Sequence, residues 1–469
     1  MRDASREGLA WDDNGLGPEP RWTRDPDIRA VARVCRRHLG IADDTPEAEF
    51  GVFFHSDGNF NKLYSVRTAR GQFMVRVSLP VDPGNKIRGE AATLQLVRRR
   101  TDIPVPAVVA FDGTRANEIG YEWLLMEKMR GTPAYYCWRK MPMAHKERLA
   151  AQAAEFQAQL FRCGNFGDGF RGIGTLGAGS GAEKATISGN LEPGQIVSSF
   201  FFTGARYHYP IPRGPFRSSH DWLRAHLNVI IKEHTAALAE AKSEDDREYA
   251  ESSLCVARKL LRTLHKIFPA IVNPSERTVV WHDDLSLRNI LVDNHGEITA
   301  VIGWECLSTV PRWVASQVPE FLRGASRETE PDRDCYTDVS DKGRGASGCG
   351  DLDDSLDNEG KTELFWIHLM EYEQTRLRNV YAARMRQLRP EWDMEVEEGA
   401  LKVDFLRAVS RCGSGFYLGR IEQWIDAIER REFLPLMEVL RVGIKKEKVG
   451  RAAPKAATSS ALAPARRVS

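Results

Sequence analysis

The spacing of apolar and polar residues follows two different patterns along the chain, and the pattern changes near residue 131. Between residues 51 and 131, short runs rich in β-branched and aromatic residues are separated by glycine or proline, which is typical of strands. One stretch in this region, 85–99, has apolar residues at helical spacing instead. The pattern predicts a small, mostly antiparallel sheet that carries one helix. The expected strands are 63–67, 73–77, 107–111 and 123–126.

Beyond residue 131 the apolar positions recur mainly with the period of a helix. A short amphipathic helix is also expected at 28–39, before the first strand. One cluster of short strands, at 279–281, 290–292 and 298–302, interrupts the helical series. The expected helices of this second region are 145–161, 221–238, 245–268, 364–388 and 403–428.

These elements predict an α+β protein with a β-rich lobe followed by a mainly helical lobe. We expect an N-terminal extension at 1–47, a first lobe at 48–130 and a second lobe at 131–440. Residues 325–360 hold eleven acidic residues against four basic ones and few apolar residues, so we expect a disordered insertion there. The basic segment 441–469 is expected to be a disordered tail.

Composition and charge exclude several classes of protein. The 469 residues include 66 Lys+Arg and 65 Asp+Glu, and this balance gives no basic field that would hold a nucleic acid. The sequence contains no apolar run of the roughly 18 residues that a membrane-spanning helix requires. The eight cysteines are scattered without a C-x-x-C pair, which favours reduced thiols in a cytoplasmic protein over a zinc site or a disulfide framework.

The strongest chemical signal is the segment His282-Asp-Asp-Leu-Ser-Leu-Arg-Asn289, placed between two of the short strands. A His-x-Asp-x-x-x-x-Asn loop has a defined use in phosphoryl transfer. Asp284 would accept the proton of an attacking hydroxyl group, and Asn289 would offer its carbonyl oxygen to a magnesium ion. His282 would brace the loop backbone. The alternative is a polar turn in which Asp and Asn only stabilise the bend.

This segment, together with Trp304-Glu305-Cys306 after the next strand, resembles the aminoglycoside phosphotransferase (phosphotransferase enzyme) family, in particular its fungal members. The resemblance extends over residues 50–435. It implies a protein-kinase-like fold with ATP bound between two lobes, a magnesium ion, and a small hydroxylated molecule as phosphate acceptor. It also implies that Asp284 and His282 belong to the catalytic group and that Asn289 is a metal ligand.

The same resemblance assigns residues in the first lobe to the nucleotide. The segment 55–64, with Gly58 as its only glycine, matches the loop that covers the phosphates, although a simple β-hairpin turn is an equal alternative. Arg76 stands where the family has a lysine that contacts the phosphates, and Glu90 is the candidate to pair with it. Glu127 and Met129 fall in the hinge that would bind adenine.

One position departs from the family pattern. The family has an aspartate that holds magnesium in an I-D-W-E motif, whereas this chain has Gly303 between Ile302 and Trp304. Glycine offers no side-chain oxygen, so metal binding would be weakened. Three interpretations remain open: an active phosphotransferase that tolerates the change, a catalytically degenerate pseudokinase-like protein that binds nucleotide or a partner, and a variant codon in an active lineage. The sequence does not identify the acceptor or the oligomeric state.

Overall fold

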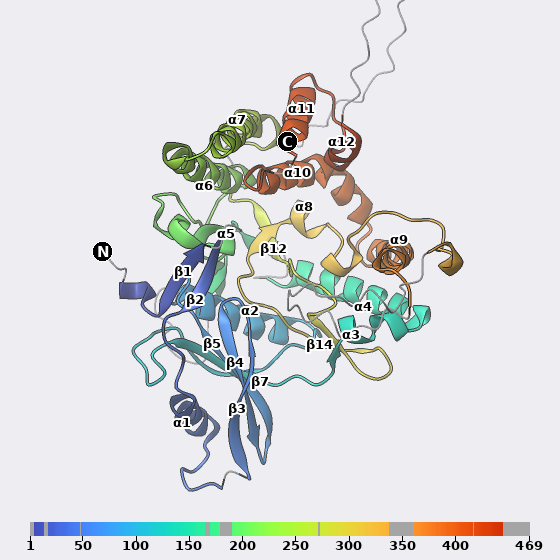
Figure 1. Ribbon diagram of the computed structural model, residues 1–469. Coiled ribbons are helices and arrows are strands. Elements are labelled where there is room, and N and C mark those ends of the chain that lie inside the picture. Colours follow the sequence, from blue (N-terminus) through green and yellow to red (C-terminus); the bar gives the residue numbers. More distant parts are fainter. Residues whose placement is uncertain are drawn as a thin grey trace, which may run out of the picture.

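A computed structural model describes residues 4–13, 17–46, 48–164, 169–178, 190–270, 273–336, 360–415 and 417–443. Within them, the expected α+β arrangement is confirmed. A β-sheet lobe forms the lower part of the molecule in Figure 1, and a helical lobe forms the upper part. No helix of the described residues is long and apolar enough to cross a membrane.

The first lobe is built on a five-stranded antiparallel sheet with the order β3-β4-β5-β7-β6. Alternation along the central strand β5 separates its two faces, because successive side chains of a strand point to opposite sides. Val75 and Val77 belong to the core on one face, whereas Met74 packs against the core on the other. The strands are β3 (Phe50–Asp57), β4 (Asn61–Thr68), β5 (Gly71–Ser78), β6 (Val108–Asp112) and β7 (Glu122–Glu127).

Each face of this sheet is covered by one helix. Helix α2 (Asn85–Arg100) contributes to the core that also contains Leu124 and Met126. Helix α1 (Ile28–Leu39) packs its buried residues into the core of Val75 and Val77. It begins at the N-cap Asp27, a typical start signal of a helix, and ends at Gly40 in the left-handed conformation, a typical stop signal.

The N-terminal segment is therefore more than an extension. The hairpin of β1 (Leu9–Asp13) and β2 (Pro18–Trp22) contributes Trp11 and Trp22 to the same core as α1. The Tyr121 hydroxyl donates to the Arg24 carbonyl at 2.7 Å. This bond joins the N-terminal segment to the residue that directly precedes β7. The composition of residues 1–47 gave no sign of this, because only α1 has a regular apolar period.

The second lobe consists mainly of long helices. The expected helix 403–428 is wrong in one respect: it is two helices, α10 and α11, separated at Gly413 and Gly415. Gly415 has a φ of +77°, a conformation that glycine adopts without strain, so the chain turns there. The long helices are α4 (Met143–Arg162), α6 (Ser219–Glu240), α7 (Glu244–Ile267), α9 (Glu363–Leu388), α10 (Trp392–Cys412), α11 (Leu418–Glu429) and α12 (Leu436–Val442).

Short strands and helical turns connect the lobes and surround the central loop. Two three-stranded sheets have the orders β15-β12-β9 and β14-β13-β8, and β10 pairs with β11. The strands are β8 (Thr132–Pro133), β9 (Phe170–Arg171), β10 (Leu176–Ala178), β11 (Leu191–Pro193), β12 (Arg277–Val280), β13 (Ile290–Val292), β14 (Ile298–Val301) and β15 (Thr309–Pro311). The short helices are α3 (Ala134–Cys137), α5 (Ser199–Phe202) and α8 (Arg312–Ala315).

The beginning of the acidic segment is mostly exposed, and it contacts helix α9 at two places. The Arg327 backbone N–H donates to Thr375 Oγ1 at 3.0 Å, and its guanidinium lies 3.1 Å from Glu371. The Tyr336 hydroxyl lies 2.6 Å from His368 Nδ1. Helix α9 therefore holds residues 325–336, while 337–359 lie outside the described residues. The same applies to 444–469 of the expected tail.

Candidate active site

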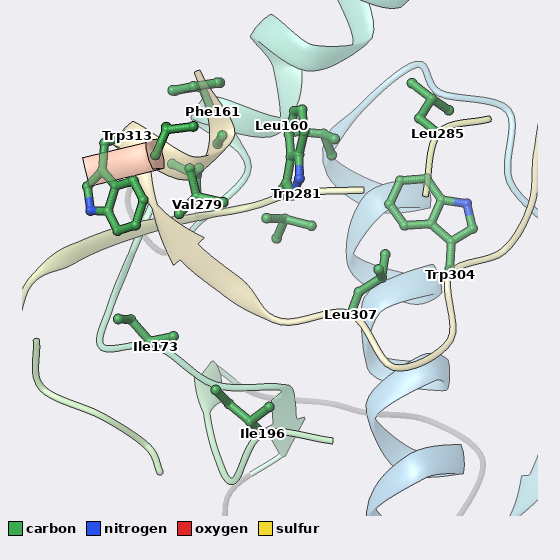
Figure 2. Packing of buried hydrophobic residues seen from close by; sticks show 14 of the residues in the cluster. Leu160, Phe161, Ile173, Ile196, Val279, Trp281, Leu285, Trp304, Leu307 and Trp313 are labelled. Carbon is green, nitrogen blue, oxygen red and sulfur yellow. The ribbon is translucent and has the colours of Figure 1, made fainter. Parts of the chain in front are cut away.

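The loop from Trp281 to Asn289 joins strands β12 and β13 and is anchored by apolar side chains. Trp281, Leu285 and Leu287 are buried in the main core, and Trp304 from the following segment belongs to the same cluster (Figure 2). Asp284, placed between these anchors, is exposed to solvent. Burial of the apolar positions therefore fixes the loop and leaves this carboxylate accessible.

Asp284 and Asn289 lie together, as their spacing predicts. The Asn289 amide donates from Nδ2 to a carboxylate oxygen of Asp284 at 2.8 Å and to its backbone oxygen at 2.8 Å. The turn between them is closed by backbone bonds from Ser286 N–H to the Asp284 carbonyl and from Asn289 N–H to the Ser286 carbonyl. The Asn289 Oδ1 atom is then the oxygen that the side chain has left for a ligand.

His282 braces the segment that leads to position 303. Its Nε2 lies 2.8 Å from the Ile302 carbonyl oxygen and must carry the proton, because a carbonyl can only accept. The ring packs edge-on against Trp304, with centroids 4.8 Å apart. Burial lowers the pKa of His282 to about 4, despite the opposing effect of the Ile302 bond, so the imidazole is neutral near pH 7.

Gly303 lies directly against Asn289. A Cβ atom at this position would be 2.7 Å from Asn289 Nδ2 and 3.0 Å from its Oδ1. The glycine has a φ of +82°, which side-chain-bearing residues other than Asn and Asp rarely adopt. Position 303 is thus adjacent to the Asp284–Asn289 pair, and it supplies no oxygen from a side chain.

The side chains present do not form a complete magnesium site. The described residues contain no group of three or more His, Cys, Asp or Glu side chains placed to hold a metal ion. Asp284 and Asn289 offer one carboxylate and one amide oxygen, whereas octahedral Mg²⁺ takes six oxygen ligands. Any metal ion here would depend on oxygens from a bound phosphate and from water.

Strand β5 of the first lobe carries Arg76, whose Nη1 lies 3.6 Å from Glu305 in the segment after β14. The expected ion pair is present: Arg76 Nη1 bonds to Glu90 Oε1 of helix α2. Only a short connection separates strand β5 from helix α2. Arg76 on the face of the strand that α2 covers therefore reaches Glu90 in the second turn of the helix. Both side chains are largely buried, and Glu90 is 2% exposed. Burial alone would lower the pKa of Arg76, but Glu90 and Glu305 raise it.

Two further residues of this ionic group, Lys86 and Asn61, were not predicted from the sequence. Lys86, in the first turn of α2, is buried and lies 2.7 Å from Glu305, which follows Trp304. Asn61, the first residue of β4, donates to the same Glu305 carboxylate at 2.9 Å. One signal was available, because a lysine in the first turn of a helix opposes the helix dipole and needs another reason to be there.

The segment expected to cover phosphates is a tight hairpin. Strands β3 and β4 extend to Asp57 and from Asn61, so only residues 58–60 form the turn. The Gly58 N–H donates to the Asn61 carbonyl at 2.8 Å. Gly58 therefore sits at the tip of the hairpin, and Asn61 joins the hairpin to the ionic group around Glu305.

The expected hinge residues lie at the end of β7. The Glu127 N–H donates to the Ala107 carbonyl at 2.9 Å, and the Lys128 N–H donates to the Gln72 carbonyl at 3.1 Å. The sheet thus already uses these two donors. Met129 follows them, directly before the turn at Gly131 that leads to β8 and the second lobe.

A pocket of about 380 Å³ adjoins the central loop on the side of the second lobe. It lies between Leu287 of the loop, Tyr135 and Trp138 near α3, and Trp366 and Ile367 of α9. The Tyr135 N–H donates to the Leu287 carbonyl at 3.0 Å, so the pocket wall and the loop are linked directly. Its lining is largely aromatic and aliphatic.

The fold and the loop geometry define a kinase-like phosphotransferase scaffold. The model of the phosphotransferase enzyme family (APH) matches residues 53–314, which is more than half of the chain, and the chain belongs to this family. The resemblance found in the sequence is thereby confirmed.

Curated relatives are known from fungi. A subtelomeric hrmA-associated cluster protein of Aspergillus fumigatus is 25% identical over 315 residues, which cover 59% of this chain and 61% of that protein. The chain thus spans about six tenths of the length of this relative. The clavilactone A biosynthesis cluster protein Y of Ampulloclitocybe clavipes is 34% identical over 103 residues, or 22% of this chain and 25% of that protein.

Solved structures of similar architecture include aminoglycoside phosphotransferases. A thermostable mutant of APH(4)-Ia in its apo form has a TM-score of 0.41 and 12% identity, covering 85% of this chain and 99% of the other. The gentamicin-APH(2")-IIa complex has a TM-score of 0.42 and 12% identity, covering 90% and 97%. A putative fructosamine-3-kinase from Haemophilus somnus 129PT has a TM-score of 0.40 and 12% identity, covering 86% and 97%. The family assignment rests on the family model and not on these superpositions.

Proposed function

We propose that this protein transfers the γ-phosphoryl group of ATP to a hydroxyl group of a small molecule. Asp284 accepts the proton of the attacking hydroxyl, the hydroxyl oxygen forms the new bond to phosphorus, and the bond to the β-phosphate oxygen breaks to release ADP. The single observation that carries the proposal is the exposed Asp284 carboxylate bonded to Asn289 at 2.8 Å, beside position 303.

The first lobe supplies the groups for the nucleotide. Arg76, aligned by Glu90, is the cation for the phosphates, and the Gly58 hairpin covers them. Glu127 and Met129 mark the backbone that receives adenine. His282 holds the Ile302 carbonyl and thereby sets the position of the Gly303 segment relative to Asn289.

The pocket beside Leu287 is the candidate acceptor site. Its aromatic and aliphatic lining favours a hydroxylated molecule with an apolar or aromatic body. Two of its carboxylates are already neutralised, because Glu373 lies 2.6 Å from Lys146 and Glu371 lies 3.1 Å from Arg327. The pocket therefore has fewer unpaired carboxylates to bind a polycationic acceptor than its number of acidic residues suggests.

The proposal is tested by ADP formation from ATP with Asp284→Asn, using Asp283→Asn as the matched control. Both substitutions remove one carboxylate from the same exposed stretch of loop. Loss of a general base costs about 10²- to 10⁴-fold in rate, so Asp284→Asn should fall by at least about 100-fold while Asp283→Asn stays near the natural chain. Equal rates for all three proteins would refute the role of Asp284.

A second candidate function is supported by Gly303. Without an oxygen ligand at this position, the chain would bind nucleotide or a partner as a scaffold or regulator and turn over little ATP. In that case the natural chain shows no ADP formation above that of Asp284→Asn, while nucleotide binding persists. The two candidates therefore differ in turnover and agree in binding.

A further inference from the structure

One carboxylate of the second lobe is held by three side chains of the first lobe. Glu305 lies 2.7 Å from Lys86 Nζ, 2.9 Å from Asn61 Nδ2 and 3.6 Å from Arg76 Nη1. It follows Gly303 by two residues, so it belongs to the segment that lies against Asn289. These contacts join the hairpin, strand β5 and helix α2 to the segment after β14.

Exposure shows how the group is layered. The Lys86 side chain has no exposed surface and that of Arg76 is 12% exposed, whereas the Glu305 side chain is 29% exposed. Glu305 is therefore the outermost member and shields the two cations from solvent. Lys86 Nζ is held from the other sides by Asn61 Oδ1 at 2.7 Å and Ser78 Oγ at 3.3 Å.

The charges of this group balance in the absence of a ligand. Lys86 and Arg76 carry two positive charges that face the carboxylates of Glu305 and Glu90. Although burial would raise the pKa of Glu305, Lys86 and Arg76 lower it to about 2, so Glu305 is ionised near neutral pH. Without a ligand, the positive charge of Arg76 is therefore already neutralised by the nearby carboxylates, which weakens its attraction for a phosphate.

We propose that Glu305 is a displaceable counter-ion and that Lys86 is a second phosphate-binding cation of the nucleotide site, exposed when phosphate takes the place of Glu305. This inference rests on the proposed function, because it assumes that a nucleotide binds beside Arg76. A buried ammonium needs an anionic partner in every state of the protein. Exchange of the Glu305 carboxylate for a phosphate keeps Lys86 paired throughout.

The placement of Lys86 favours this role over simple helix stabilisation. In the first turn of α2 its charge opposes the dipole of its own helix, so the local structure gains nothing from a cation. Its partner Glu305 is 219 positions away in the sequence and belongs to the other lobe (305 − 86). Arg76 bonds to Glu90 and lies farther from Glu305, at 3.6 Å. For Lys86, the partly exposed Glu305 is the only carboxylate partner within 4 Å among the described residues.

The test is calorimetric titration of the full chain with ATP and with inorganic tripolyphosphate, in the absence of magnesium. Glu305→Gln keeps the shape and removes the competing charge, so it should bind both ligands at least about tenfold more tightly than the natural chain. The double variant Lys86→Met/Glu305→Gln should lose this gain. Glu297→Gln, at the exposed turn before β14, is the control and should leave affinity unchanged.

The possible outcomes separate this inference from the proposed function. If the natural chain binds ATP and Glu305→Gln binds it equally or more weakly, the ion pair is a structural link between the lobes and the inference is wrong. If neither protein binds ATP, either without magnesium or after magnesium is added, the proposed function fails. Glu305→Asp retains the charge but shortens the side chain away from Lys86, so it should show an intermediate gain and provides a second readout if Glu305→Gln does not fold.

Discussion

At the scale of single residues, Gly303 controls the surroundings of the Asn289 side chain. The glycine leaves the Asp284–Asn289 pair intact, because a side chain at 303 would collide with the Asn289 amide, only 2.7 Å from the missing Cβ. The residue therefore has two effects at once. It offers no side-chain oxygen at this position, and it leaves room for the Asn289 amide nitrogen to donate to Asp284.

Gly303→Asp and Gly303→Ala together separate these two effects. Both add a Cβ at a φ of +82° and both displace Asn289, so each should lower the free energy of unfolding by about 1–3 kcal/mol. Only the aspartate adds a carboxylate. We expect magnesium to raise the ATP affinity of Gly303→Asp by at least about tenfold over that of Gly303→Ala. The same response to magnesium in both variants would show that position 303 does not contact the metal.

At the scale of elements, local patterns predicted the sheet and helices well, and distant contacts were not predictable. The Arg76–Glu90 pair joins a strand to the helix that follows it, so register and helical spacing suffice to expect it. The Lys86–Glu305 pair joins elements far apart in the sequence, and no local period indicates it. The contacts of Arg327 and Tyr336 with α9 were not predictable for the same reason.

Helix boundaries show the same limit. The apolar period over 403–428 continues across Gly413 and Gly415, and only the observed turn shows that the chain reverses there. The role of α1 as a cover for the sheet was also missed, since its apolar face was predicted but the surface it packs on was not. The candidate site could be located to one loop and one strand, but the group around Glu305 required coordinates.

The bond between His282 and the segment after β14 gives a pH prediction for these elements. Burial lowers the pKa of His282 from 6.5 to about 4, so the folded state disfavours its charged form. Below pH 6.5 the unfolded chain takes up the proton first, and stability falls until the pH reaches the folded pKa near 4. The free energy of unfolding that this one residue contributes falls by about 3 kcal/mol over this pH range.

Urea unfolding between pH 7.5 and 4.5 measures this effect. The natural chain should lose stability as the pH falls, and His282→Gln should lose less over the same range. His226 is also buried with a pKa lowered to about 4, so part of the pH dependence should remain in the variant. His295→Gln, in an exposed turn, is the control. Parallel curves for His282→Gln and the natural chain would contradict a neutral, buried His282.

At the scale of the whole molecule, the proposed phosphotransfer requires that two lobes act on one ligand. Asp284 and Asn289 belong to the helical lobe, Arg76 and the Gly58 hairpin belong to the sheet lobe, and Glu305 bonds directly to Asn61 and Lys86 across them. The arrangement in Figure 1, with the β12–β14 region between the sheet below and the helices above, agrees with such a site.

Hydrogen–deuterium exchange of the full chain with and without ATP tests this claim most directly. If one nucleotide is held by both lobes, exchange should slow in the hairpin and strand β5, residues 57–78, and also in the loop and strand β13, residues 281–292. Helices α7 and α11, which lie above the β12–β14 region in Figure 1, should be unaffected. Protection confined to one lobe, or ATP binding that protects neither segment, would contradict a shared nucleotide site and the phosphotransfer built on it.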